Sequence, residues 1–187
     1  MTRVLLVRHA RPAAAFDSEL DPGLDGMGRR QAGALAEDLV ARGPLEVVTS
    51  PLRRARETAA PLAERWGIVP VVVPAFGEIP SPTEEPSARG VWIRTVLGAR
   101  WSELAPELAH WRAELLETLR GVRVDTMIFT HFVAINTVVG AAAGVDLVTS
   151  FSPGHGSVTE VEIGPDAVTL VALGAATPTD GRGEDVR

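Results

Sequence analysis

Cationic and imidazole side chains follow three apolar segments of the chain, each close to the point where a β-strand is expected to end. They are Arg8 and His9 after residues 3–7, Arg54 after residues 45–49, and His131 after residues 124–129. Ligands in open α/β sheets bind just outside the carboxyl ends of the strands, so parallel strands would bring these groups to one edge. Because guanidinium groups bind phosphate oxygens through paired hydrogen bonds, we expect an anion site there.

The predicted helix that carries Arg54 has three arginines in its first turns, where the helix dipole already places about half a positive charge. A bound anion would relieve this conflict, and a helix N-terminus flanked by arginines is a good phosphate site. Arg53 and Arg56 are interpreted as solvated or paired with Glu57 and Glu64, whereas Arg54 is interpreted as functional.

Segments typical of strands and helices alternate along the chain, which favours an α/β fold with a mostly parallel sheet. Strands are expected at residues 3–7, 45–49, 69–73 and 124–129, with a terminal hairpin of 158–163 and 167–173. Helices are expected at residues 28–41, 51–66, 91–97, 106–120 and 132–143, with Ser50 as the N-cap of the second and Pro51 as its first residue. We expect one three-layer domain (1–175) with helices on both faces of the sheet, a helical cap inserted at 75–120 that sets specificity, and a flexible tail at 176–187.

Composition argues against several classes of function. The 187 residues carry a formal net charge of −6, which argues against binding to nucleic acid. There is no cysteine, and the four histidines form no pair with metal-ligand spacing, so neither a metal nor another cofactor is expected. No apolar run approaches the ~20 residues of a membrane span, and no signal peptide is recognisable, so we expect a cytoplasmic protein without a membrane partner. The pattern indicates no particular oligomeric state.

Four sequence blocks resemble the histidine phosphatase superfamily, also called phosphoglycerate-mutase-like. They are residues 5–10 (LLVRHA), 24–36 (LDGMGRRQAGALA), 50–61 (SPLRRARETAAP) and 129–131 (FTH). The first is similar to the family's strand followed by Arg-His-Gly, and the third is similar to its Ser-Pro-Leu-x-Arg-Ala-x-x-Thr-Ala block. The resemblance extends over residues 4–173, in the family's order and spacing.

This resemblance implies a role for each matched residue. His9 is the expected nucleophile, and Arg8, Arg54 and His131 are expected to bind the phosphoryl group, with His131 also counted as catalytic. Neutral imidazole is a workable nucleophile, and phosphoryl transfer needs mainly positioning and charge neutralisation. Two arginines and a second imidazole could supply both without a metal ion.

The resemblance also implies a proton donor. Glu78, in the stretch 76–79 (FGEI), resembles the family's acid after the third strand, and Glu84 and Glu85 remain alternatives. A carboxylic acid can protonate the leaving oxygen if burial or neighbouring charge raises its pKa.

The chain departs from the family pattern next to the expected nucleophile. Ala10 stands where the family usually has glycine, and residues 11–16 (RPAAAF) lack the Thr and Asn of many relatives, with Arg11 as a possible substitute ligand. His155 lies on a glycine-flanked loop and is interpreted as a residue outside the site.

The sequence therefore predicts a histidine acid-type phosphatase that hydrolyses a small phosphorylated substrate through a phosphohistidine on His9. One alternative within the superfamily is phosphoglycerate-mutase-type phosphoryl transfer. Another, from a different class, is a phosphate- or phosphopeptide-binding module without turnover, which Ala10 and the missing polar ligands keep open. The sequence does not identify the physiological substrate.

Overall fold

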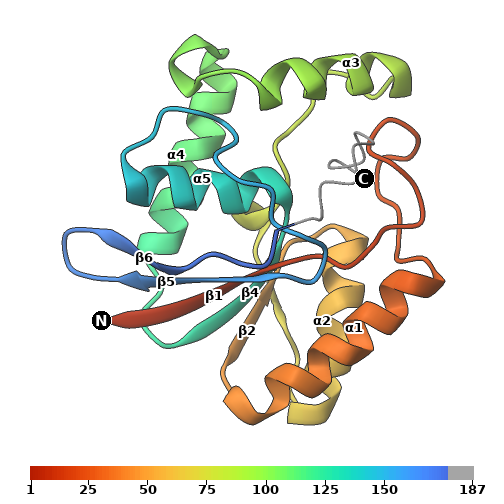
Figure 1. Cartoon of the computed structure of the whole chain (residues 1–187), viewed down its shortest axis with the longest axis vertical. Coiled ribbons are helices and arrows are strands. Elements are labelled where there is room, and N and C mark those ends of the chain that lie inside the picture. The colour runs from red at the N-terminus through yellow and green to blue at the C-terminus, as the bar shows by residue number, and fades with distance from the viewer. Residues whose placement is uncertain (177–187) are drawn as a thin grey trace.

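A six-stranded sheet forms the centre of the structure, a computed structural model that describes residues 1–176 (Figure 1). The strands are β1 (Thr2–Arg8), β2 (Glu46–Thr49), β3 (Val71–Val72), β4 (Thr126–Thr130), β5 (Val158–Ile163) and β6 (Val168–Ala172). Their order is β3-β2-β4-β1-β5-β6, with β3, β2, β4 and β1 parallel and the β5–β6 hairpin antiparallel to β1. The predicted α/β fold with a mostly parallel sheet is confirmed. Of the predicted tail at 176–187, all but Ala176 lies outside the described residues.

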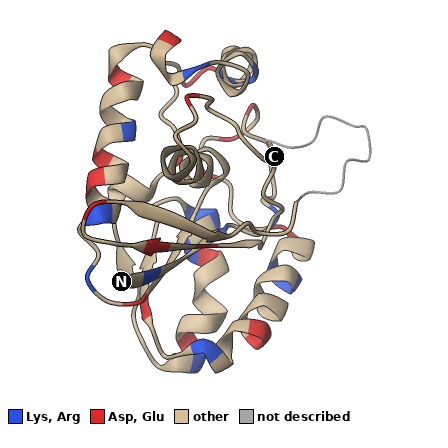
Figure 2. Ribbon diagram, turned by 60° about the vertical axis from the view of Figure 1, so that its left-hand side comes forward, with Lys and Arg blue, Asp and Glu red and all other residues tan. Residues whose placement is uncertain are grey.

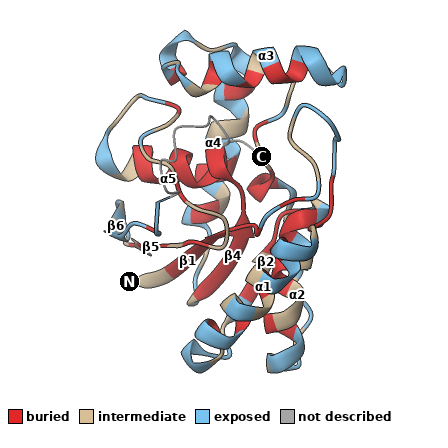
Figure 3. Ribbon diagram, turned by 45° about the vertical axis from the view of Figure 1, so that its right-hand side comes forward, coloured by how far each residue is buried: buried red, intermediate tan, exposed pale blue. Residues whose placement is uncertain are grey.

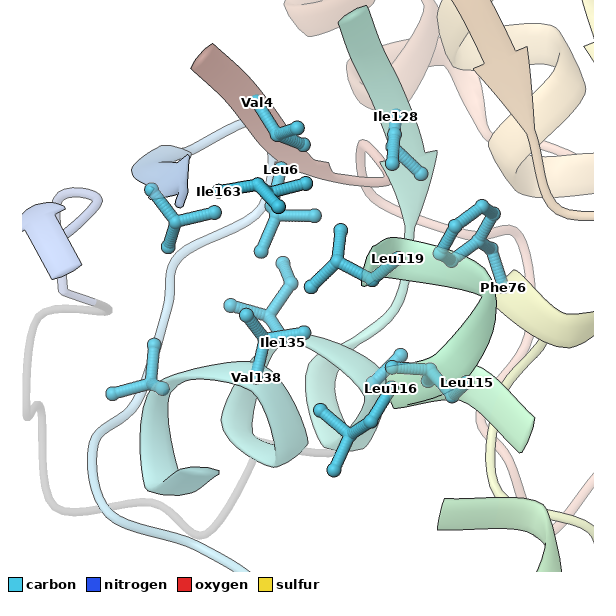
Figure 4. Close-up of a cluster of buried hydrophobic side chains, with 13 residues drawn as sticks. Val4, Leu6, Phe76, Leu115, Leu116, Leu119, Ile128, Ile135, Val138 and Ile163 are labelled. Atoms are coloured by element: carbon cyan, nitrogen blue, oxygen red, sulfur yellow. The ribbon is translucent and has the colours of Figure 1, made fainter. Parts of the chain in front are cut away.

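Helices cover both faces of this sheet. They are α1 (Gly26–Leu39), α2 (Arg53–Trp66), α3 (Pro86–Leu97), α4 (Pro106–Arg120) and α5 (Phe132–Ala143). Alternate residues of β1 point to opposite faces. Leu5 and Val7 pack with α1 and α2, whereas Val4 and Leu6 pack with α4 and α5 (Figure 4). Residues 4–7 of β1 are therefore all apolar, as expected for a strand segment that is buried on both faces of the sheet.

Helix α5 is the most enclosed of the helices. Its residues from Phe132 to Gly140 are all buried, and Figure 3 shows this helix almost entirely in the colour of buried residues. A helix that is apolar all round belongs in a core rather than at a surface. Because α5 begins directly after His131, the core fixes the position of that histidine.

Helix α3 lies away from the sheet and packs on the rest of the molecule through a separate apolar cluster (Figure 1). That cluster joins Ile93 and Val96 of α3 to Trp101 and to Phe132 and Val133 at the start of α5. The last turns of α4, in contrast, contribute to the core beside the sheet. The predicted cap at 75–120 therefore contains one outlying helix and one helix that is partly integral to the core.

Several predicted boundaries were wrong, and α3 begins at Pro86 instead of residue 91. The third strand has only two residues instead of five, because Pro70 and Pro74 lack the N–H groups that a longer edge strand would need. The second helix begins at Arg53, and Ser50 is not its N-cap. The Ser50 hydroxyl instead accepts a hydrogen bond from the Leu52 amide and makes a second one within the site.

Both signs of charge are interspersed over the outer helices in the view of Figure 2. Within residues 1–176, no helix is both long enough and apolar enough to span a bilayer.

Candidate active site

The carboxyl ends of β1, β4 and β2 lie side by side and carry the predicted site residues. The backbone continues the sheet pairing past the strands, since the amide of His9 donates to the carbonyl of Thr130 at 3.0 Å and that of Ser50 to Phe129 at 2.9 Å. The rings of His9 and His131 are consequently 5.1 Å apart between centroids. The parallel order of these strands brings residues from distant parts of the sequence to one edge, as expected.

The protonation state of His9 follows from its neighbours. Its Nδ1 lies 2.8 Å from the carbonyl oxygen of Ala10, which can only accept, so Nδ1 carries the proton. Its Nε2 therefore has a free lone pair, and Nε of Arg54 donates to it at 3.2 Å. Burial lowers the pKa of His9 well below its usual value, and the charge of Arg54 lowers it further. The imidazole is therefore neutral at pH 7 and has its nucleophilic nitrogen beside a guanidinium.

Two buried arginines flank this imidazole. The Arg8 side chain is held by a hydrogen bond from Nη1 to the carbonyl of Pro153 at 2.6 Å, and its guanidinium carbon lies 5.0 Å from the centroid of the Phe132 ring. Arg54 is 6% exposed, and Nη1 lies 3.9 Å from the carboxylate of Asp21. Burial lowers the pKa of Arg54, yet a guanidinium remains charged at any working pH.

His131 is fully buried and oriented by Ser50. Its Nε2 lies 2.7 Å from the Ser50 hydroxyl, and its Nδ1 is buried without a hydrogen-bond partner among residues 1–176. Burial lowers the pKa of His131 well below its usual value, and the charges of Arg54 and Arg8 act in the same direction. Sequence reasoning assigned Ser50 to a helix cap and missed this contact.

Glu78 lies at the N-terminus of α5. Its carboxylate accepts hydrogen bonds from the amides of Ile79 (3.0 Å) and Val133 (3.2 Å). Burial raises the pKa of Glu78, although these amides and the charge of Arg54 oppose the rise. A carboxyl group with a raised pKa in a cleft is suited to donate a proton.

The two alternative acids lie elsewhere. Glu85 caps α3 by accepting hydrogen bonds from the amides of Ser87 and Ala88, and these contacts lower its pKa. Glu84 is exposed, and neither residue lines the cleft that contains Glu78.

A narrow cleft of about 20 Å³ opens over Arg8, His9, Arg54 and Glu78, whereas His131 lies beneath His9 and does not line it. It is lined by Arg8, His9, Pro12, Ala14, Phe16, Glu19, Leu20, Pro22, Arg54, Glu78 and Phe132. Six of these belong to the loop after β1, of which sequence reasoning connected only residues 11–16 with the site. The position of this loop in the sequence could have indicated its role, because the chain that continues from His9 at the sheet edge must pass beside the site.

The departures from the family pattern have a simple structural account. Ala10 is fully buried in a small cluster with Leu24 and Ala32, so its methyl group packs towards α1 and does not line the cleft. Arg11 is paired with Asp25 at 2.6 Å at the start of α1, and the idea that it substitutes for a phosphate ligand is not supported.

His155, in contrast, lies closer to the site than expected. Its ring centroid is 5.5 Å from that of His9. The amide of Gly156 donates to the carbonyl of Arg8, and the amide of Arg8 donates to the carbonyl of Ser157, each at 3.0 Å. These bonds attach the loop before β5 to the end of β1 and bring His155 beside His9.

Comparison with known proteins identifies the family of the chain. The family model of the histidine phosphatase superfamily (branch 1) matches residues 4–176, and the chain belongs to this family. A glucosyl-3-phosphoglycerate phosphatase of Mycobacterium tuberculosis is 42% identical over 71 residues, which are 36% of this chain and 32% of that protein. The sequence match thus spans about a third of that curated relative.

Solved structures match over much more of the chain. A mycobacterial glucosyl-3-phosphoglycerate phosphatase in complex with VO3 has a TM-score of 0.69 and 25% identity, covering 94% of this chain and 100% of the other. A mutant phosphoserine phosphatase of Entamoeba histolytica in complex with phosphoserine has a TM-score of 0.73 at 19% identity, covering 94% and 98%. The second likeness shows the fold alone.

Proposed function

We propose that this protein is a metal-independent phosphomonoesterase that works through a phosphohistidine on His9. The observation that carries the proposal is the hydrogen bond from Nδ1 of His9 to the Ala10 carbonyl, because it leaves the Nε2 lone pair beside Arg54. A neutral imidazole held in one tautomer between two cations is prepared to attack phosphorus.

In the first step, Nε2 of His9 forms a bond to phosphorus while the bond to the ester oxygen breaks. Arg8 and Arg54 neutralise the charge on the equatorial oxygens, and His131, which is buried beside His9, is assigned as a further donor through its Nδ1. The protonated carboxyl of Glu78 gives its proton to the departing alkoxide.

In the second step, the Glu78 carboxylate takes a proton from water, which attacks phosphorus and breaks the bond to Nε2. Phosphate leaves, and both His9 and Glu78 return to their starting states. The loop residues that line the outer cleft, Pro12 and Ala14 among them, offer few polar groups to retain a second hydroxyl substrate. This favours hydrolysis over mutase chemistry.

The direct test is capture of the intermediate. Rapid mixing with an aryl phosphate, followed by an alkaline quench that preserves the acid-labile N–P bond, should leave one phosphoryl group on His9 by peptide mass analysis. The His9→Ala variant should lose several orders of magnitude in kcat, consistent with losses seen for nucleophiles. His110→Ala, which changes an exposed histidine, is the matched control.

Three outcomes would contradict the proposal. Near-normal turnover by the His9→Ala variant would show that His9 is not the nucleophile. Interconversion of 2- and 3-phosphoglycerate with little phosphate release would indicate a mutase. Tight binding of phosphate esters without turnover of any would indicate a binding module.

A further inference from the structure

The outer part of the cleft is lined mainly by apolar side chains, which the proposed chemistry does not use. Beyond the three cationic or imidazole groups and the acid at its base, the lining residues are Pro12, Ala14, Phe16, Leu20, Pro22 and Phe132, which together form an apolar wall, and the acidic Glu19. Leu20 belongs to this wall although it is 50% exposed. Ligand sites are typically lined by apolar side chains with a few polar groups that orient the ligand. The wall therefore indicates apolar contacts with the part of the substrate that is attached to phosphorus.

The loop that carries most of this wall is fixed by contacts on two sides. The amide of Ala13 donates to the carbonyl of Gly23 at 2.8 Å, which closes the loop at its base. The Phe16 ring stacks on Trp92 of α3, and the buried guanidinium of Arg89 lies over it at 4.2 Å from the ring centroid. Figure 1 shows this loop on the same side of the molecule as α3. Because the wall is formed before a ligand arrives, binding does not pay the cost of ordering it.

The charges around the cleft restrict the ligand further. Residues 12–22 contain no lysine or arginine, and their three charged residues, Asp17, Glu19 and Asp21, are all acidic and exposed. Arg89 does not line the cleft, so the lining residues of the described chain include no cation beyond the two arginines assigned to the phosphoryl group. A leaving group with a carboxylate or a second phosphate would meet like charge at the mouth and an apolar wall inside. An uncharged leaving group has neither cost.

We propose that the substrates of this site are phosphate monoesters of apolar, uncharged alcohols, whose carbon skeleton packs on the apolar wall. The inference rests on the proposed phosphatase function and adds the class of alcohol that is released. The phosphoryl group would lie between His9 and Arg54, with the ester oxygen towards Glu78. The alcohol would then extend along the wall towards Leu20, whose exposed surface it would cover.

A series of unbranched alkyl phosphates tests this assignment. Ethyl, butyl and hexyl phosphate release alkoxides of nearly equal basicity, so their chemistry is matched and they differ chiefly in apolar surface. Each methylene that packs on the wall should raise kcat/KM by about twofold to fourfold, so hexyl phosphate should exceed ethyl phosphate by about 15-fold or more. Replacement of the terminal methyl group of hexyl phosphate by a carboxylate should lower kcat/KM by at least about fivefold.

Leu20→Ser is the variant that tests the wall, because the exposure of Leu20 makes loss of folding unexpected. It should lower kcat/KM for hexyl phosphate by about threefold to tenfold, with a smaller loss for ethyl phosphate. Leu173→Ser is the matched control, since Leu173 is 51% exposed and does not line the cleft, and it should keep the full dependence on chain length.

Four results would overturn the proposal. They are a kcat/KM that does not rise with chain length, a wild-type preference for the carboxylated ester, a preference for 5-aminopentyl phosphate over pentyl phosphate, and equal losses on ethyl and hexyl phosphate in Leu20→Ser. The last result would assign Leu20 to the structure of the loop rather than to contact with the alcohol.

A binding measurement separates this inference from the proposed function. Alkylphosphonates carry the same apolar chains on a P–C bond that a phosphomonoesterase does not hydrolyse. Calorimetry should show Kd falling from ethylphosphonate to hexylphosphonate in the wild type, and falling less steeply in Leu20→Ser. If no ester is hydrolysed but this trend persists, the phosphatase proposal fails and the apolar wall stands as a binding site. If aryl phosphate is hydrolysed but neither kcat/KM nor Kd depends on chain length, only this inference fails.

Discussion

Nε of Arg54 lies 3.2 Å from Nε2 of His9, so the guanidinium contacts the single ring nitrogen that has a lone pair. This contact occupies the lone pair of the proposed nucleophile. In the proposed reaction this hydrogen bond must break when phosphorus approaches Nε2 of His9. The Nε–H group of Arg54 can then donate to an oxygen of the phosphoryl group. Arg54 therefore changes partner during the proposed reaction without leaving its position.

The first prediction follows from that exchange. Arg54→Lys should reduce kcat/KM by about 10²–10³, because an ammonium group on a flexible stem cannot replace a fixed guanidinium fork. Arg53→Lys is the control, since Arg53 is largely exposed and paired with Glu57. Steady-state kinetics on one aryl phosphate measures both variants. A similar loss of kcat/KM in both variants would indicate that a disturbance of α2, rather than loss of the contact with His9, causes the effect.

The second prediction concerns pH. The pKa of His9 is lowered from 6.5, so kcat/KM should fall only in acid well below that value, where the imidazole becomes protonated. The pKa of Glu78 is raised from 4.5, so kcat/KM should also fall as pH rises through that raised value and the proton donor is lost. Ionisation of the ester near pH 6 affects every variant equally. If kcat/KM of the Glu78→Gln variant declines at alkaline pH in the same way as that of the wild type, another group is responsible for the decline.

The third prediction separates the two acids that line the cleft. Glu78→Gln should slow alkyl phosphates by about 10²–10⁴, with a smaller loss for aryl phosphates, whose leaving groups need less protonation. Glu19→Gln should change neither by more than a fewfold, because Glu19 is exposed. Equal losses on alkyl and aryl esters in Glu78→Gln would contradict its role as the proton donor.

The fourth prediction concerns metals. Within residues 1–176, no three His, Asp or Glu side chains are grouped to hold an ion. Activity should therefore survive dialysis against EDTA, and vanadate, a mimic of pentavalent phosphorus, should inhibit. Loss of activity on chelation, followed by recovery with zinc or manganese, would contradict the metal-independent mechanism.

The fifth prediction concerns the close contact that positions the loop after β1. A Cβ atom at Gly28 would lie 2.0 Å from the carbonyl oxygen of Arg11, whereas one at Gly33 meets nothing within 4 Å. Gly28→Ala should therefore reduce the free energy of unfolding by about 1–3 kcal/mol. Gly33→Ala, in the same helix, should raise it by roughly 0.5–1 kcal/mol. Thermal or urea unfolding of the two variants tests the contrast, and equal stabilities would contradict the packing argument.

Periodicity and strand-end position were enough to predict the central fold. Short, largely apolar segments at residues 3–7 and 124–129 indicated buried strands, and the residues that follow them meet because parallel strands end at one edge. The same reasoning, together with the family resemblance, gave five candidate residues, of which Arg8, His9, Arg54 and Glu78 line one cleft and His131 lies beside His9.

Contacts that depend on loop paths could not be predicted in this way. His155 is distant from His9 in sequence and reaches it only because its loop is hydrogen-bonded to the backbone of Arg8. Arg89 has no motif around it, and only the packing of α3 against Phe16 reveals that it is buried. Ser50 has a side chain suited to either a helix cap or a histidine contact, and local sequence does not distinguish between them.

The division of the cleft between enclosed and exposed segments has a consequence for engineering. The groups proposed to handle phosphorus include Arg8 and His9 at the end of β1, Arg54 at the start of α2 and His131 between β4 and α5, and the packing of these elements tolerates little change. The opposite wall is the largely exposed loop after β1, which sits below α3 and contributes little to the core. Libraries confined to this loop and to the exposed turns of α3 should therefore yield variants with new leaving-group preferences at little risk to folding, whereas recombination across β1 or α5 should yield mostly insoluble chains.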